Sequence, residues 1–156
     1  MEPNHEDREA GFTLIEMMTV VMIIAVLIAV LIPNFLHTRR PAQDRQAQSL
    51  LRNGLTAART IAAERGDLSA ANTTTLPLAE PETVFVDALV SGQAKDKGVS
   101  VASGAGYVIL ASLSTSGRCF AVMDRDAAAP AFQRVETVDC KASQFDPAVG
   151  WSAQWP

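Results

Sequence analysis

One carboxylate lies at the start of a long apolar stretch. Glu16 ends the hexapeptide GFTLIE at residues 11–16, and from Met17 to Ile32 every residue except Thr19 is apolar. An isolated carboxylate deep in lipid costs on the order of 3 kcal/mol or more, so an acid here needs a named partner. The first chemistry that the sequence presents is therefore the pairing of a single charge in apolar surroundings.

No other set of residues indicates catalysis. The two histidines are His5, in the polar N-terminal segment, and His37, just after the apolar stretch. Metalloprotease, serine-hydrolase and phosphate-loop motifs do not occur, and no paired acids have a supporting group. Four acids could be imagined as calcium ligands, but their spacing matches no EF-hand loop and we interpret them as solvated turn residues. They are Asp124, Asp126, Asp139 and Asp146. We expect no enzyme, no metal and no cofactor.

The length and composition allow one modest domain and one membrane helix. The chain has 156 residues, and its formal net charge of -4 gives no reason to expect nucleic-acid binding through bulk electrostatics. The apolar stretch counted from Phe12 is 21 residues long. As a helix rising about 1.5 Å per residue it would reach roughly 30 Å, which is enough to cross a bilayer core.

An amphipathic helix is predicted to follow, from Phe35 to about Arg65, with Gly66 as its C-cap. Its apolar residues recur at three- and four-residue steps and form one stripe. They are Ala47, Leu50, Leu51, Leu55, Ala58, Ile61 and Ala62.

The next segments are predicted to be a loop and a short helix. Residues 67–81 are rich in Ser, Thr, Ala and Pro, which is typical of a loop, and Asn72 begins a glycosylation acceptor pattern that also arises by chance. Residues 82–90 fit a helix or a strand, and Pro81-Glu82 at their start favours the helix.

Residues 98–138 are predicted to form an antiparallel sheet. Bulky and β-branched residues at 107–113 predict one strand, residues 114–117 a turn, and residues 119–123 the return strand. Alternation at 132–138 predicts a further strand at an edge. The fold class is therefore α+β, with a long N-terminal helix followed by a C-terminal antiparallel sheet.

The N-terminal residues resemble those of a type IV pilin precursor. The resemblance covers residues 10–33: the GFTLIE hexapeptide, the apolar helix with Pro33 near its end, and no other charge before Arg39. Beyond them only the general layout agrees. The resemblance implies a leader at 1–11, a transmembrane and filament-core helix at 12–33, an amphipathic helix at 34–66 packed on the sheet, and a globular region at 67–156.

Processing and assembly are implied by the same resemblance. A membrane-embedded prepilin peptidase would cut between Gly11 and Phe12, and the new amine of Phe12 would be N-methylated. In a filament the amine of one copy could meet Glu16 of its neighbour in an apolar core, which would fix the register of assembly. The alternative is that Glu16 reaches the lipid headgroups from near the helix end.

The implied function is that of a subunit of a helical filament of identical copies. The precursor would wait in the inner membrane as a single-span protein, and a pilus assembly ATPase with its platform proteins would extract it to the cell surface. The filament would serve adhesion, twitching motility or DNA uptake, with minor pilins as further partners. The alternatives are a pseudopilin or minor pilin of a secretion or competence system, and a membrane-anchored binding module that is never cut.

Two features depart from the family or stay open. The leader is acidic, with only Arg8 as a base. By the positive-inside rule, Arg39 and Arg40 would place the C-terminal end of the apolar helix in the cytoplasm, whereas in the family the N-terminus is cytoplasmic. We follow the family topology. Pro33 fits a static kink or a point where the helix melts and extends in the filament.

Six arginines line the predicted amphipathic helix. They are Arg39, Arg40, Arg45, Arg52, Arg59 and Arg65. We interpret them as a solvated face with salt bridges to neighbouring subunits, and DNA or anionic lipid is the alternative.

The two cysteines, Cys119 and Cys140, favour a disulfide in an oxidising compartment, with a pair of buried thiols as the alternative. The pair resembles the disulfide near the C-terminus of type IV pilins, although a 16-residue tail lies outside it here. In that tail, Trp151 and Trp155 are interpreted as packing anchors, with adhesive contacts as the alternative.

Overall fold

The computed structural model describes residues 11–87, 98–137 and 139–156, and the side chains of all of these except residues 32–38. The chain forms two compact units, Met1–Arg39 and Arg40–Pro156. The long helix α1, Leu14–Arg65, contributes to both units, as the sequence predicts. It ends at Gly66, whose φ of 82° is a left-handed conformation that glycine adopts without strain.

Among the described residues, the second unit contains a five-stranded sheet. The strands are β1 (Val84–Val86), β2 (Gly98–Gly104), β3 (Tyr107–Leu113), β4 (Arg118–Arg125) and β5 (Ala131–Glu136). They lie in the order β1-β2-β3-β4-β5; β2 to β5 are antiparallel, and β1 is parallel to β2. The predicted α+β class, the strands on either side of the turn at 114–117, and the edge position of β5 are confirmed.

The predicted helix at 82–90 is wrong in its described part. Val84, Phe85 and Val86 form β1, which pairs with β2. Phe85 is only 7% exposed in the core, so burying this aromatic side chain between β-branched neighbours outweighs the helix-start pattern of Pro81-Glu82. Residues 88–90 lie outside the described residues.

The segment predicted as a loop at 67–81 contains two short helices. The 3-10 helix η1 spans Leu68–Ala70 and the α-helix α2 spans Leu76–Ala79. Leu68 and Leu76 are buried and anchor the segment to the core. Each of these single helical turns therefore forms around one buried leucine, although the segment consists mostly of residue types that favour loops.

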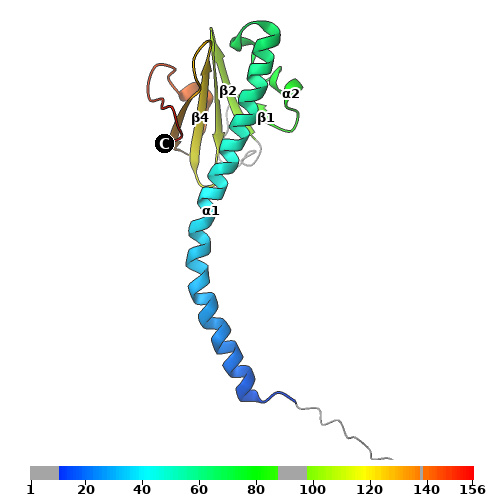
Figure 1. The fold of residues 1–156 in the computed structure, drawn as a ribbon, viewed down its shortest axis with the longest axis vertical. Helices are drawn as coiled ribbons and strands as arrows, with labels where there is room; N and C mark the ends of the chain where they lie inside the picture. The colour runs from blue at the N-terminus through cyan, green and yellow to red at the C-terminus, as the bar shows by residue number, and fades with distance from the viewer. Residues whose placement is uncertain (1–10, 88–97, 138) are drawn as a thin grey trace, which may run out of the picture. The chain divides into compact units, whose positions relative to one another are not determined.

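Both faces of the sheet are covered. On one face, Val108 and Leu110 of β3 pack in a core with Leu51 of α1, which lies along the sheet in Figure 1. On the other face, Ile109 and Ala111 pack with residues of the segment after Cys140. The two-residue alternation of strand side chains thus sends one set of β3 residues to each core.

The C-terminal tail packs on the sheet and its edge. Ser152 forms an isolated antiparallel bridge with Phe132 of β5. The Trp155 ring lies 5.5 Å from the ring of Phe120 and 4.6 Å from that of Phe132. Trp151 lies 6.0 Å from Phe145. The interpretation of both tryptophans as packing anchors is confirmed.

Candidate functional site

The first turn of α1 is closed by a reciprocal pair of side chains. Thr13 precedes the helix; its carbonyl accepts the amide of Met17, and its hydroxyl oxygen accepts the amide of Glu16 at 3.2 Å. The Glu16 carboxylate reaches back to the amide and the hydroxyl of Thr13, at 3.5 Å each. This is a capping box, which satisfies two helix-end donors that would otherwise lack partners. The described structure therefore gives Glu16 a partner in its own chain.

The Gly11-Phe12 junction lies outside the helix and is open. Both residues are exposed and non-helical. A Cβ built on Gly11 would meet no heavy atom within 4 Å, and its φ is not in the left-handed region. Packing and backbone geometry in the described part of the chain therefore do not require a glycine at position 11.

The helix behind the junction is fully exposed over the length of a membrane span. The window Leu14–Leu31 has a mean hydropathy of 2.8 and no buried residue, and by length and composition it could cross a membrane. The hydroxyl of Thr19 donates to the carbonyl of Ile15 at 2.8 Å, so the one polar side chain inside this window beyond Glu16 is satisfied within the helix. Soluble monomers rarely expose an apolar surface of this extent.

Pro33 and His37 lie within the bounds of α1, and their side chains are outside the described part of the structure. A kink or a melting point at Pro33 stays a prediction.

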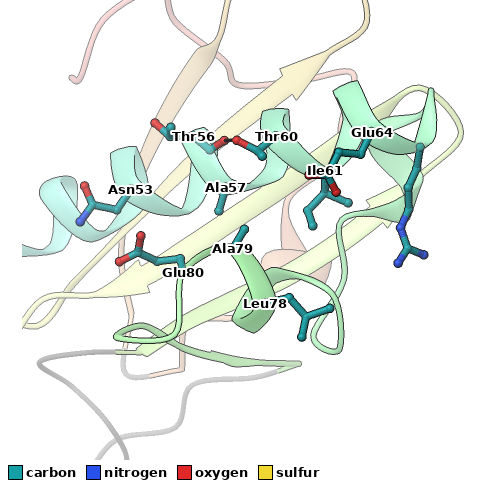
Figure 2. A pocket seen from close by; sticks show the side chains of 10 residues that line it. Asn53, Thr56, Ala57, Thr60, Ile61, Glu64, Leu78, Ala79 and Glu80 are labelled. Carbon is teal, nitrogen blue, oxygen red and sulfur yellow. Dashed lines mark hydrogen bonds between the residues drawn. The ribbon is translucent and has the colours of Figure 1, made fainter.

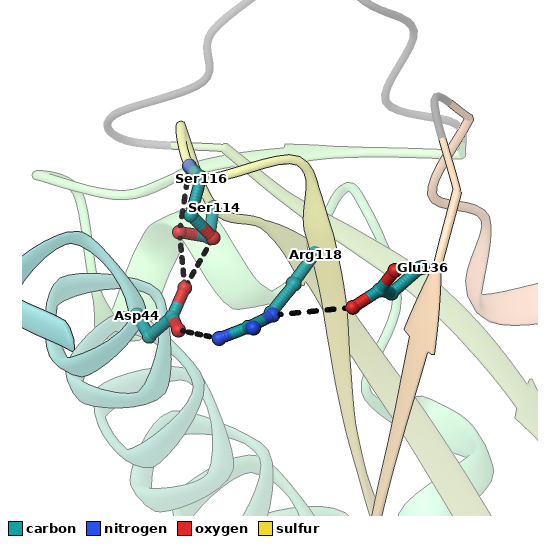
Figure 3. Close-up of polar contacts among 5 residues, drawn as sticks. All are labelled: Asp44, Ser114, Ser116, Arg118 and Glu136. Atoms are coloured by element: carbon teal, nitrogen blue, oxygen red, sulfur yellow. Dashed lines mark hydrogen bonds and ion pairs between the residues drawn. The ribbon is translucent and has the colours of Figure 1, made fainter. Parts of the chain in front are cut away.

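The second unit holds a buried carboxylate with three side-chain donors (Figure 3). Asp44 on α1 is 7% exposed, and it accepts from Ser114 at 2.8 Å, from Ser116, and from the guanidinium of Arg118 at 2.8 Å. Arg118 also faces Glu136 at 3.5 Å. Burial raises the pKa of Asp44, but the hydrogen bonds of the two serines and the charge of Arg118 together hold this pKa below its ordinary value.

A second ion pair joins α1 to the sheet. The Nε and Nη2 atoms of Arg59 donate to the two carboxylate oxygens of Asp124, at 2.7 and 3.0 Å. Its hydrogen bond to Asp124 raises the pKa of Arg59. Asp124 is 3% exposed on β4, so its interpretation as a solvated turn acid is wrong, and Arg59 pairs within its own chain.

The cysteines form a disulfide in the structure. The Cα atoms of Cys119 and Cys140 are 5.5 Å apart, and both residues are fully buried in the core that faces away from α1. Ser100 lies in the same region; its hydroxyl donates to the carbonyl of Asp87 and accepts the amide of Ala142. Among the described residues, no group of three or more His, Cys, Asp and Glu could hold a metal ion.

The comparisons with known proteins concern the N-terminal part of the chain. A family model described as the prokaryotic N-terminal methylation motif matches residues 7–32. This motif is the class III signal peptide of type IV pilin precursors, and it supports a pilin-like or pseudopilin precursor. No curated protein and no solved structure matches the chain.

Proposed function

Because residues 7–32 carry the class III signal peptide of type IV pilin precursors, we propose that this chain is a structural subunit of a type IV pilus. A pseudopilin shares the same motif. The buried disulfide and the hydroxyl-rich segment at 72–75 suit a subunit exposed to the medium and lead us to prefer the pilus.

The observation that carries the proposal is the exposed apolar helix behind the motif. Its window Leu14–Leu31 is wholly unburied in the isolated chain, so another apolar phase must cover it. In the precursor that phase is the inner membrane, and in the filament it is the same segment of other copies. Transfer between two apolar environments keeps the helix covered throughout assembly.

Processing is proposed at the Gly11–Phe12 bond. A peptidase needs an accessible, non-helical substrate, and this junction is exposed and precedes the helix. The capping box begins at Thr13, so removal of the leader 1–11 leaves the helix start unchanged. The new ammonium is carried by Phe12, which would then be N-methylated.

Glu16 is proposed to pair with the Phe12 amine of a neighbouring copy. A carboxylate offers about four acceptor positions, and Thr13 occupies some of them on one oxygen only. The other oxygen can therefore accept a second donor while the cap stays in place. The Glu16 side chain would then cap the helix of its own copy and also set the register with a neighbouring copy.

The partners and places that follow are proposals of the same kind. They are the prepilin peptidase, the assembly ATPase with its platform, minor pilins, the inner membrane for the precursor and the cell surface for the filament. Pro33 is proposed as the point where α1 bends or extends on assembly. Adhesion, motility or DNA uptake would be the use of the filament.

The test separates the charge of Glu16 from its cap. Glu16→Gln keeps an acceptor that a capping box tolerates but removes the charge, whereas Thr13→Ala removes the cap and keeps the charge. We expect Glu16→Gln to enter the membrane and be cut, yet to give roughly tenfold fewer sheared filaments, since a charged contact in an apolar core is lost. Thr13→Ala should stay near the wild-type yield.

Filament yield is measured by shearing cells and immunoblotting, with the membrane fraction as the loading control. Wild-type filaments from Glu16→Gln would remove the register role. Equal loss in Thr13→Ala and Glu16→Gln would assign the effect to the helix cap instead.

A further inference from the structure

The outward face of α1 carries two arginines that form no ion pair among the described residues. Arg45 and Arg52 are exposed and seven residues apart, so they project from the same side of the helix two turns from each other. Arg59, a further seven residues along the helix, differs because it forms an ion pair with Asp124. The segment between Arg45 and Arg52 is therefore a basic face with unused charge.

A groove lies between α1 and α2 (Figure 2), and its α1 wall begins one residue after Arg52. Its volume is about 430 Å³, and its walls include Asn53, Thr60 and Glu64 of α1. On the other side lie Leu78 of α2 and Glu80, the residue after it. Leu78 is 77% exposed, whereas Leu76 of the same short helix is fully buried in the core.

The chain around the groove is acidic. Residues 66–87 contain four acids and no lysine or arginine. Asp67 is used as the cap of η1, where it accepts the amide of Ser69 at 2.9 Å. Of the other three, Glu82 and Asp87 are exposed and Glu80 is half-buried. The groove lining itself holds two acids, Glu64 and Glu80, and one base, Arg65, so acids outnumber bases there. One chain therefore presents a basic face and a groove of net negative charge, and these charges do not pair with each other in the described contacts.

We propose that the α1–α2 groove binds the basic face of a second copy of this chain, with Arg45 and Arg52 against Glu64 and Glu80. This inference rests on the proposed filament function and names a contact within it. The groove begins at Asn53, where the basic face ends, so the two patches follow one another along α1. Their centres are separated by roughly 16 Å at about 1.5 Å per residue, which a copy displaced along the helix axis would bridge.

The arrangement favours an open polymer over a closed dimer. Two different patches of one chain meet, so each copy keeps a free basic face at one end and a free groove at the other. The complementary partner of the arginines is present in the chain itself, whereas a nucleic-acid site draws its affinity from the neutralisation of several phosphates, for which two arginines are few. Charge complementarity thus selects another copy as the occupant.

The experiment exchanges the charges in the full chain. Arg45→Glu with Arg52→Glu, and Glu64→Arg with Glu80→Arg, should each lower the yield of sheared filaments about tenfold or more, because like charges then face each other. The chain with all four substitutions should return to within about twofold of wild type, since the pairing is restored with reversed sign. The control is Arg134→Glu with Lys141→Glu, the same charge change at exposed positions elsewhere, and it should leave the yield unchanged.

Each variant must show wild-type amounts of processed chain in the membrane. Unchanged yields in both reversed pairs, or a fourfold variant no better than the pairs, would overturn the groove contact while leaving the filament function intact. Loss in the arginine pair alone would point to lipid or nucleic acid as the partner of that face. Absence of the chain from wild-type filaments would instead remove the proposed function and this contact with it.

A second readout identifies the contact directly. Arg52→Lys keeps the charge and supplies an amine that a carbodiimide can join to a carboxylate at contact distance. In filaments assembled from isotopically mixed copies, the peptide containing position 52 should link to the peptide containing Glu80 of a differently labelled copy. Links within single copies only would contradict the proposal.

Discussion

Two acids on α1 have opposite surroundings. Glu16 lies on an exposed apolar helix and accepts hydrogen bonds only from Thr13 among the described residues. Asp44 is buried and accepts from two serines and one arginine. A fully partnered carboxylate such as Asp44 serves the fold, whereas an exposed one with spare acceptor capacity such as Glu16 is available to another molecule.

The first prediction concerns Gly11, where an added Cβ would meet no atom of the described residues within 4 Å. Gly11→Val should leave the unfolding of the second unit unchanged and yet abolish removal of the leader, because the added bulk meets only the peptidase. Gly11→Ala, with a single methyl group, should be cut at an intermediate rate. The mass of the chain in membrane fractions checks this, and normal cutting of Gly11→Val would show that no steric requirement exists at this position.

The second prediction concerns Asp44. Asp44→Asn should lower the free energy of unfolding by about 1–3 kcal/mol, because a buried hydrogen-bonded charge is lost. Denaturant unfolding of the detergent-solubilised chain measures the change, and Asp126→Asn, at an exposed position, is the matched control. A loss no larger than that of the control would contradict the role of this network.

The pKa of Asp44 sets the pH dependence. This pKa is lower in the folded chain than the value of about 3.9 expected when unfolded. The contribution of Asp44 is therefore fully present above about pH 4 to 5 and is lost as the pH falls through the folded-state pKa. Hydrogen bonds from Ser69 also lower the pKa of Asp67, which adds a change of the same sign. On acidification, the free energy of unfolding of Asp44→Asn should therefore fall less than that of the wild-type chain.

The sequence contained signals for both acids that differ in strength. Thr13-Leu14-Ile15-Glu16 before an apolar run is a capping-box pattern, a local signal for the Thr13–Glu16 hydrogen bonds that the cost of a carboxylate in lipid does not predict. Asp44 lies three residues before Ala47, in phase with the buried stripe, which marks it as an inward-facing acid. Its serine partners come from a turn some 70 residues later, and nothing local predicts that meeting.

At the scale of elements, the strongly periodic segments were predictable and the short ones were not. The 3- and 4-residue spacing of the buried α1 residues, and the alternation in β3, follow directly from how helices and strands expose their side chains. β1 has three residues, too few for a period, and its strand state depends on pairing with β2. The turns η1 and α2 likewise depend on tertiary burial of Leu68 and Leu76.

The third prediction concerns the bridge between β4 and the C-terminal segment. Cys119→Ala with Cys140→Ala should lower the free energy of unfolding by roughly 3 kcal/mol, because the link closes a loop of about 20 residues that would be free in the unfolded chain. Thermal unfolding in detergent measures this, and reduction of the wild-type chain should reproduce the loss. Two alkylatable thiols in the native protein would contradict the bridge.

At the scale of the whole molecule, the chain combines two kinds of surface. Leu14–Leu31 is exposed and apolar, whereas the described residues of the second unit bury two cores and expose charges. The apolar helix surface is unfavourable in water, and the charged surface of the second unit is unfavourable inside a membrane. The family motif at 7–32 and this division were both readable from the sequence, but the contacts between copies depend on surfaces that only the folded chain presents.

The central claim is that the chain is cut before Phe12 and polymerises through the helix that follows. The most direct test is intact-mass spectrometry of subunits from filaments sheared from the cell surface. The account predicts a chain that begins at N-methylated Phe12 and keeps the disulfide between Cys119 and Cys140. Filaments that lack this chain, or that contain it with residues 1–11 still attached, would contradict it.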